Sequence, residues 1–446
     1  MRKNDSNLID ADAPEPFKNR NLIAQFLSGM LGLFSGEAAR GGYLAAIDQG
    51  MISVSNFLAT LILARIASPT ELGVYGVGFT ALRLIRALQD GITVQPLNTF
   101  GAGMDQPGWQ RYVSATGVMQ LILALATALT AALLGCLLIK LGNDTAGPAM
   151  FSLWSAFLFW QLFEFIRRAL YTRNRVQLAL LNSTISNIIR LSIMLWWAAQ
   201  GQLNGVTSIS AIAIGSLAAL VPGIWQTRSD WSFRDLKLLQ TWNKNWRFGK
   251  WILGSSTSSW LAIEFYPVLT AGIVNFAAVG AYRALQNLVA PILVLIRASD
   301  TYMTPRAAKI YDQSGLSALT RLLQKTYLIL SIPVTGLLVV ALLFPEQLLY
   351  RLYGDTYLPF SRGATLMILF YALLFAYTPA QTALKAVRIS KPLFYAYIGA
   401  IIAMFTVGVL LIQNWGVYGT IAGQVLNSLI IFVILWSYWR IVRRNL

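Results

Sequence analysis

Five arginines lie inside long apolar stretches of this sequence: Arg83, Arg86, Arg190, Arg283 and Arg297. A lone arginine at the centre of a bilayer costs about 2.5–3.5 kcal/mol on insertion scales, so such residues face a polar cavity or a partner. Guanidinium groups bind phosphate and carboxylate in a bidentate fashion. The arginines therefore predict a binding site for an anionic molecule.

The spacing of these residues separates local pairs from deeper charges. Arg83 and Arg86 are three residues apart and share a helix face, and Asp90 follows Arg86 by four, close enough to neutralise it. Arg83 lies deepest and has no acid at pairing distance along its own helix, because Asp90 is seven residues away. Two further pairs near the ends of apolar stretches are interpreted as local: Glu164 with Arg168, and Arg297 with Asp300.

Other deep polar residues extend the candidate site. Arg190 lies on a polar stripe formed with residues 182, 183, 186 and 187, and Glu264 follows the serine-rich segment GSSTSSW. Arginine outnumbers acid, which suits a substrate carrying phosphate or carboxylate. The candidate substrate-binding residues are Arg83, Arg190, Arg283, Glu264, Asp48 and Arg86.

Composition excludes several kinds of chemistry. The chain has no histidine and one cysteine, so metal sites of the His or Cys/His kind, histidine acid/base catalysis and an internal disulfide are all excluded. The sequence shows neither a glycine-rich phosphate loop nor an acidic pair in an aqueous loop. We therefore expect no enzyme, no cofactor and no metal, and the lone Cys136 is interpreted as a small packing residue.

The elements that position the candidate site are membrane helices. Hydrophobic residues make up 56% of the 446 residues and charged residues only 12%, against about 25% charged in soluble domains. Apolar runs of about 20 residues recur along the chain, which is typical of an all-α polytopic membrane protein. Twelve spans are predicted, at residues 43–64, 72–100, 112–139, 149–169, 176–199, 206–226, 251–275, 279–303, 322–344, 364–386, 393–413 and 417–441.

The distribution of basic residues predicts the orientation. Of the 35 lysines and arginines, only Arg65, Lys140, Arg351 and Arg362 fall in the loops on one side of the predicted membrane, while the other side, with both termini, holds most of the rest. The positive-inside rule therefore predicts that both termini are cytoplasmic. It also explains most of the formal charge of +17 without a nucleic acid partner.

The twelve spans divide into two sets of six. Segment Ala64–Tyr75 matches segment Ala271–Tyr282 at a constant offset, pairing Gly73 with Gly280, and each segment joins the first two spans of its half. A parallel two-lobe repeat is predicted. The domains are a cytoplasmic tail at residues 1–42 with an interfacial helix at 22–34, a first lobe at 43–227, a cytoplasmic linker at 228–250 and a second lobe at 251–446.

Several segments resemble a known family. They are ILARIASPTELGVYGVGFTAL, LLFPEQLLYRLYGDTYLPFSRGATLMIL, ALKAVRISKPLFYAYIGAI and NWGVYGTIAGQVL. They are similar to the polysaccharide-transporter branch of the multidrug/oligosaccharidyl-lipid/polysaccharide exporter superfamily, to which O-antigen and exopolysaccharide flippases belong. The resemblance implies two six-helix lobes in a V, as in multidrug exporters of this superfamily, with a central cavity lined by the first two spans of each lobe.

The resemblance also implies a function. A flippase would carry an undecaprenyl-diphosphate-linked oligosaccharide across the bacterial inner membrane by alternating access. The expected partners are that lipid, membrane lipids, a proton or Na⁺ as coupling ion, and a polysaccharide polymerase or glycosyltransferase. The alternative is a cation-coupled multidrug or lipid exporter of the same superfamily, which would more naturally hold a carboxylate-rich cavity. A membrane scaffold would give no reason for the deep charges.

Overall fold

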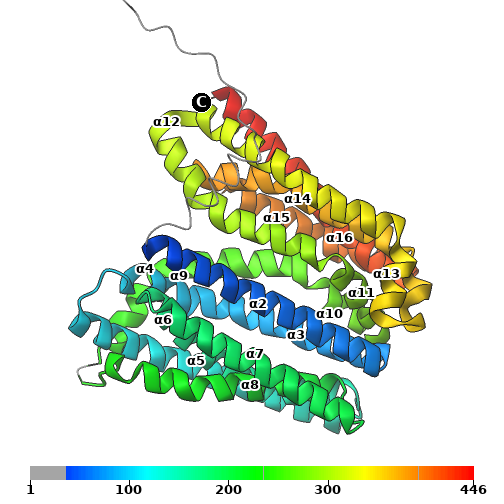
Figure 1. Ribbon diagram of the computed structural model, residues 1–446, viewed down its shortest axis with the longest axis horizontal. Helices are drawn as coiled ribbons and strands as arrows, with labels where there is room; N and C mark the ends of the chain where they lie inside the picture. The colour runs from blue at the N-terminus through cyan, green and yellow to red at the C-terminus, as the bar shows by residue number, and fades with distance from the viewer. Residues whose placement is uncertain (1–36, 235, 390, 446) are drawn as a thin grey trace, which may run out of the picture.

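The computed structural model describes residues 37–234, 236–389 and 391–445, and every regular element in these ranges is helical. The predicted interfacial helix at residues 22–34 lies outside the described residues. The helices form two groups that converge at the end where α13 lies and spread apart toward the end where α12 turns and the chain terminates (Figure 1). We call these the α13 end and the C-terminal end of the molecule.

The first group is the N-lobe. Its helices are α2 (Glu37–Ile66), α3 (Pro69–Gln89), α4 (Gln95–Gly101), α5 (Gln106–Lys140), α6 (Ala146–Thr172), α7 (Val176–Ala199) and α8 (Gly205–Gln226). A π-helical turn at Asp90–Val94 joins α3 to α4, and a 3₁₀ turn at Arg228–Asp230 follows α8.

The second group is the C-lobe. Its helices are α9 (Leu238–Glu264), α10 (Tyr266–Ile273), α11 (Phe276–Leu288), α12 (Ala290–Leu343), α13 (Pro345–Tyr353), α14 (Gly363–Ala386), α15 (Lys391–Ala403) and α16 (Val409–Asn445). A 3₁₀ turn at Asp355–Phe360 follows α13, and a π-helical turn at Met404–Gly408 joins α15 to α16. Because α9 begins at Leu238, the second half of the predicted linker is already helical.

All twelve predicted spans fall on these helices. Within the described residues, eight helices are long and apolar enough to cross a membrane, and the pair Phe276–Leu288 and Ala290–Arg297, bent by 59°, makes a ninth. One of the eight, Lys391–Arg444, has 54 residues, or about 80 Å if straight, more than twice the roughly 30 Å of hydrocarbon in a bilayer. It therefore has room for two spans. The remaining two predicted spans, in α3 and α9, carry the charged and hydroxyl side chains that lower their hydropathy.

Glycines make the sharp turns within the long helices. Gly315 interrupts α12 with a φ of 72°, and Gly416 interrupts α16 with a φ of 53°. Residues with a Cβ rarely adopt this left-handed region, so glycine favours a reversal at these points. Each glycine separates two predicted spans, and the turn at Gly315 brings the two arms of α12 side by side at the C-terminal end (Figure 1).

Residues Ser68 and Pro69 set the start of α3. Ser68 caps the helix by accepting a hydrogen bond from the Glu71 backbone N–H at 3.4 Å, and Pro69 occupies the first helical position. Pro is tolerated there because its missing N–H needs no partner. The Glu71 carboxylate in turn accepts a bond from the Gly205 N–H at 2.7 Å, which ties α3 to the start of α8.

Candidate substrate site between the lobes

An ion pair in the second half of α3 joins the two lobes. The Arg83 guanidinium donates to the carboxylate of Glu264, and Glu264 is the last residue of α9. The side chains retain 27% and 18% of their exposure, so both remain accessible at the lobe interface. Phe79, one turn before Arg83, lies under the guanidinium with 5.1 Å from its carbon to the ring centre. The deep arginine that lacks an acid in its own helix therefore finds one in the opposite lobe.

Arg283 and Trp260 of the C-lobe converge on the turn of α3 that precedes Arg83. The Arg283 guanidinium donates to the Gly76 carbonyl at 2.8 Å and to the Thr80 hydroxyl, and the Trp260 indole donates to the Thr80 carbonyl at 3.2 Å. A Cβ at Gly76 would lie 2.8 Å from the Arg283 Cγ. Glycine at this position therefore makes room for the arginine, which is only 7% exposed.

Arg190 lies inside the N-lobe. It is 6% exposed, and its guanidinium donates to the Asn56 side-chain oxygen at 2.8 Å and to the Tyr75 hydroxyl. Its backbone packs closely against α8, where a Cβ at Gly215 would meet Arg190 Cβ at 3.1 Å. The structure thus uses this arginine to join α2, α3 and α7, and brings it neither to Arg83 nor to Arg283.

Asp48 is also buried in the N-lobe, at 1% exposure. Its carboxylate accepts a bond from Arg167 at 2.5 Å and from the Tyr171 hydroxyl at 2.6 Å. Arg167 is itself only 3% exposed within α6 and has buried partners on both α2 and α6.

Glu164 is the second partner of Arg167. The guanidinium binds both carboxylate oxygens at 2.8 Å, and Arg168 adds a third bond at 3.0 Å, which confirms the predicted local pair. Arg86 reaches Glu164 at 3.7 Å and Asp90 at 3.9 Å. Asp48, Arg86, Asp90, Glu164, Arg167 and Arg168, which we call the N-lobe charge network, have a formal charge of zero. In the sequence, the four-residue spacings of Arg86 with Asp90 and of Glu164 with Arg168 indicated part of this network.

At the α13 end, α3 and α11 cross at two glycines. A Cβ on Gly73 would lie 1.7 Å from the Phe276 carbonyl oxygen, and a Cβ on Gly280 would lie 2.0 Å from the Pro69 carbonyl oxygen. Gly73 and Gly280 are the equivalent residues of the predicted repeat, and Pro69 and Phe276 have the same offset of 207 as Gly76 and Arg283. We call these four residues the glycine crossing. The contact is symmetric because each lobe supplies the same glycine and the same carbonyl.

Arg65 adds a further bond between the lobes at the same end. From the last turn of α2 it donates to the carbonyl oxygens of Leu352, at 2.5 Å, and Arg351, which end α13. A cation suits the C-terminus of a helix because unpaired carbonyls and the helix dipole are both negative there. The glycine crossing and Arg65 together close the α13 end.

Toward the C-terminal end, α9 stays packed on the N-lobe. A Cβ on Gly249 would lie 1.9 Å from the Gly91 carbonyl oxygen, and Tyr112 donates to the Asn245 side chain at 2.7 Å. The other C-lobe helices diverge from α2 at this end (Figure 1). The candidate site at Arg83 and Glu264 thus lies between a closed end and a spreading end.

Comparison with known proteins places this chain in a family. The family model described as "Polysaccharide biosynthesis protein" matches residues 62–362, two thirds of the chain. The chain belongs to this family. No curated protein sequence matches it at a significant level. The predicted membership in the polysaccharide-transporter branch of the exporter superfamily, abbreviated MOP, is confirmed.

Solved structures share the fold of this family member. A multidrug resistance MATE family transporter of the MOP superfamily, in an inward-facing conformation, has a TM-score of 0.72 at 14% identity over 87% of this chain and 94% of its own. The lipid II flippase MurJ has a TM-score of 0.67 at 14% identity over 88% and 86%. A MOP superfamily transporter from Pyrococcus furiosus, with a binding pocket described as reversed in polarity, has a TM-score of 0.62 at 15% identity over 93% and 97%. The predicted two-lobed, all-α membrane fold is confirmed.

Proposed function

We propose that this protein is a flippase that moves an undecaprenyl-diphosphate-linked oligosaccharide across the bacterial inner membrane for polysaccharide biosynthesis. Membership in a polysaccharide biosynthesis family supports the pathway class. The shared fold with transporters and a lipid flippase supports movement across the membrane as the activity. The charged groups between the lobes support an anionic lipid as the cargo.

The Arg83–Glu264 ion pair carries the proposal. At this contact between the lobes, the Arg83 guanidinium is partly exposed and its charge is neutralised by the Glu264 carboxylate. A diphosphate offers the same bidentate acceptor geometry as the carboxylate, so it is able to replace Glu264 on the Arg83 guanidinium. This exchange avoids leaving a bare cation in the membrane, which would cost several kcal/mol. Because the lipid tail is apolar, it remains in the bilayer while the polar head passes between the lobes.

Arg283 supports Arg83 in this proposal. The Arg283 guanidinium donates to Gly76 and Thr80 of α3. Thr80 lies one helical turn before Arg83, so Arg283 adds positive charge next to the Arg83 site. Arg190 and Asp48 have a different role here, because their polar groups are engaged within the N-lobe. We assign them to the rigidity of the N-lobe, and Arg86 to its charge network. The proposed substrate contact is thus Arg83, with Arg283 positioning the α3 turn beside it and Glu264 as the competing anion.

Alternating access follows from the two ends of the molecule. With both termini in the cytoplasm, the C-terminal end is cytoplasmic and the α13 end is periplasmic. The structure then represents a state closed to the periplasm by the glycine crossing and Arg65. Substrate binding from the cytoplasmic side separates Glu264 from Arg83, and the released carboxylate takes up a proton or Na⁺. The lobes reform the ion pair after the cargo leaves toward a polymerase or glycosyltransferase.

Reconstitution into proteoliposomes tests the activity. A fluorescent undecaprenyl-diphosphate oligosaccharide is placed in one leaflet, and its loss to a membrane-impermeant quencher is followed. Wild-type protein is expected to move the label between leaflets faster than empty liposomes. A cationic dye is the second substrate, because the alternative, a multidrug exporter, would transport the dye. Dye transport without lipid flipping would overturn the proposal.

A further inference from the structure

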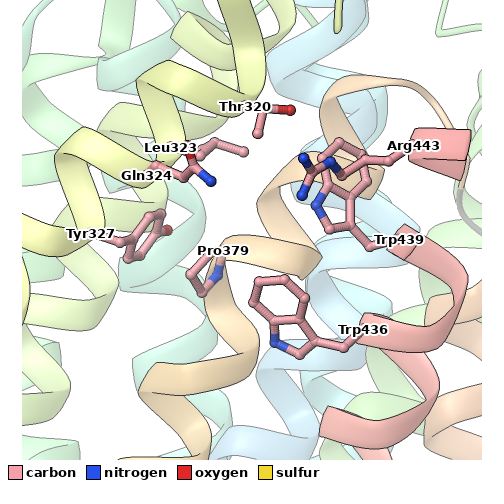
Figure 2. Close-up of a pocket in the computed structure, with 8 residues that line it drawn as sticks. All are labelled: Thr320, Leu323, Gln324, Tyr327, Pro379, Trp436, Trp439 and Arg443. Atoms are coloured by element: carbon pink, nitrogen blue, oxygen red, sulfur yellow. The ribbon is translucent and has the colours of Figure 1, made fainter. Parts of the chain in front are cut away.

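A cavity of about 150 Å³ lies in the C-lobe, away from the site between the lobes. It is lined by Thr320, Leu323, Gln324 and Tyr327 of α12, Pro379 of α14, and Trp436, Trp439 and Arg443 of α16 (Figure 2). We propose that this cavity binds an anionic phospholipid, with the headgroup phosphate at Arg443.

Helix packing explains why the cavity exists. α14 packs extensively against both α12 and α16, whereas α12 and α16 have at most marginal contact with each other in the described residues. A groove is therefore left between them over Pro379. The four α12 residues share one face because they recur at three- and four-residue spacing, and so do Trp436, Trp439 and Arg443.

The cavity is amphipathic from its floor to its rim. Leu323, Tyr327 and Trp439 are buried at 4%, 6% and 4% exposure, while Gln324 and Arg443 are exposed. The Trp436 indole is held in the wall by donating to the Ala376 carbonyl at 2.9 Å. In Figure 2 the Arg443 guanidinium lies beside Trp439 and points toward the side where the Gln324 amide lies. An apolar, aromatic floor under a cationic rim suits a lipid headgroup and the first part of its acyl chain.

The charge around the rim selects an anion. Arg321, Lys325, Arg440 and Arg444 are exposed close to Arg443 along α12 and α16. No acidic residue occurs in α14, in α16 or in α12 beyond Gly315. Basic pockets between membrane helices on the cytoplasmic side commonly bind anionic headgroups. Asp300, an acid on the other arm of α12, is paired with Lys385 at 3.2 Å. The excess of basic side chains around the rim thus favours an anionic lipid over a zwitterionic one.

The size of the cavity selects a small headgroup. A cavity of about 150 Å³ accommodates a group the size of benzene, which is room for a phosphate group but not for an oligosaccharide. The proposed cargo is therefore not the ligand here. This site does not depend on the proposed function, since its binding is measured without transport.

Lipid binding to the purified protein tests the proposal. Native mass spectrometry would count dioleoylphosphatidylglycerol and dioleoylphosphatidylcholine bound at equal concentrations, and inorganic phosphate would be titrated as a competitor. Wild-type protein is expected to prefer phosphatidylglycerol. Arg443→Gln is expected to weaken that binding about tenfold, because it removes a charge-assisted contact. Arg111→Gln, which removes an equal and exposed charge from α5 of the N-lobe, is the matched control and is expected to bind like wild type.

A second variant tests the cavity itself. Thr320→Trp places an indole in the groove without removing a hydrogen bond between helices, because within the described part of the chain the Thr320 hydroxyl donates to the Leu316 carbonyl of its own helix. It is expected to abolish the preferred phosphatidylglycerol site while Arg443 remains. Three results would overturn the proposal: equal effects of the two arginine substitutions, binding of phosphatidylglycerol unchanged by Thr320→Trp, or displacement of the lipid by inorganic phosphate at similar concentration.

Discussion

Gly73 of α3 and Gly280 of α11 occupy equivalent positions in the two lobes, and each lies against a backbone carbonyl of the opposite helix. The symmetry extends to the carbonyls, which belong to the equivalent residues Pro69 and Phe276. A contact that repeats itself in this way lets two similar lobes meet on one shared surface. In this state it holds the α13 end closed.

Gly73→Ala is expected to open the α13 end. The new methyl group would lie 1.7 Å from the Phe276 oxygen, and overpacking of this kind costs about 1–3 kcal/mol. The equilibrium is therefore expected to shift roughly tenfold toward a state open at that end. Hydrogen–deuterium exchange of residues 69–76 and 276–283 should rise accordingly.

Gly272→Ala is the matched control for this experiment, because nothing lies within 4 Å of a Cβ at Gly272. It should leave exchange in both segments unchanged. Equal exchange in the Gly73 variant and the wild type would show that the crossing does not hold the end closed.

Arg83→Ala is expected to slow flipping by roughly 10- to 100-fold, the value of a lost charge-assisted hydrogen bond of about 1.5–3 kcal/mol. Arg83→Lys should recover only part of the rate, since an ammonium cannot bind a diphosphate in a bidentate way. The measurement is the proteoliposome assay, normalised to the amount of reconstituted protein. Arg388→Ala is the control, because its pair with Asp312 at 2.7 Å is exposed. A fully active Arg83→Ala variant would remove Arg83 from the substrate site.

Glu264→Gln is expected to strengthen binding of undecaprenyl diphosphate and to slow turnover. The amide keeps the shape of the side chain but removes the anion that competes for Arg83, so affinity should rise by roughly three- to tenfold. The return step loses the carboxylate that reforms the ion pair, so the flipping rate should fall. Equilibrium binding and flipping, measured on the same preparation, separate the two effects. Weaker binding by the variant would mean that Glu264 contacts the substrate directly.

Arg167→Met is expected to destabilise the N-lobe by about 3–5 kcal/mol, because it leaves buried carboxylates without their main partner. Adding Asp48→Asn should restore part of the loss by neutralising one of them. Thermal unfolding in detergent would show both effects. Arg388→Ala again serves for comparison, since an exposed pair contributes about 0–1 kcal/mol. Unchanged stability of Arg167→Met would indicate that water or another group replaces the guanidinium.

Several features of the fold were predictable because they depend on neighbours in the chain. The cap residue Ser68 and the following Pro69 indicate where α3 begins. The Glu164–Arg168 pair is expected from its four-residue spacing on one helix. Cys136, in contrast, was expected to pack against other residues but is exposed on α5. An apolar helix surrounded by lipid gives no pattern that separates its packed face from its lipid face, because both are apolar.

The sequence by itself determined the membrane class, the two-lobe repeat, the family and the list of deep charges, because these follow from apolar length, offset and residue type. Only the tertiary structure decided which charges meet. Arg83 pairs with Glu264 across a sequence separation of 181 residues. Arg190 bonds to Asn56 across 134 residues, and Arg167 pairs with Asp48 across 119 residues. A charge in a membrane helix must have a partner, but its identity depends on how the helices rotate and pack against one another. That packing places Arg83 between the lobes and encloses Arg190 and Asp48 within one of them.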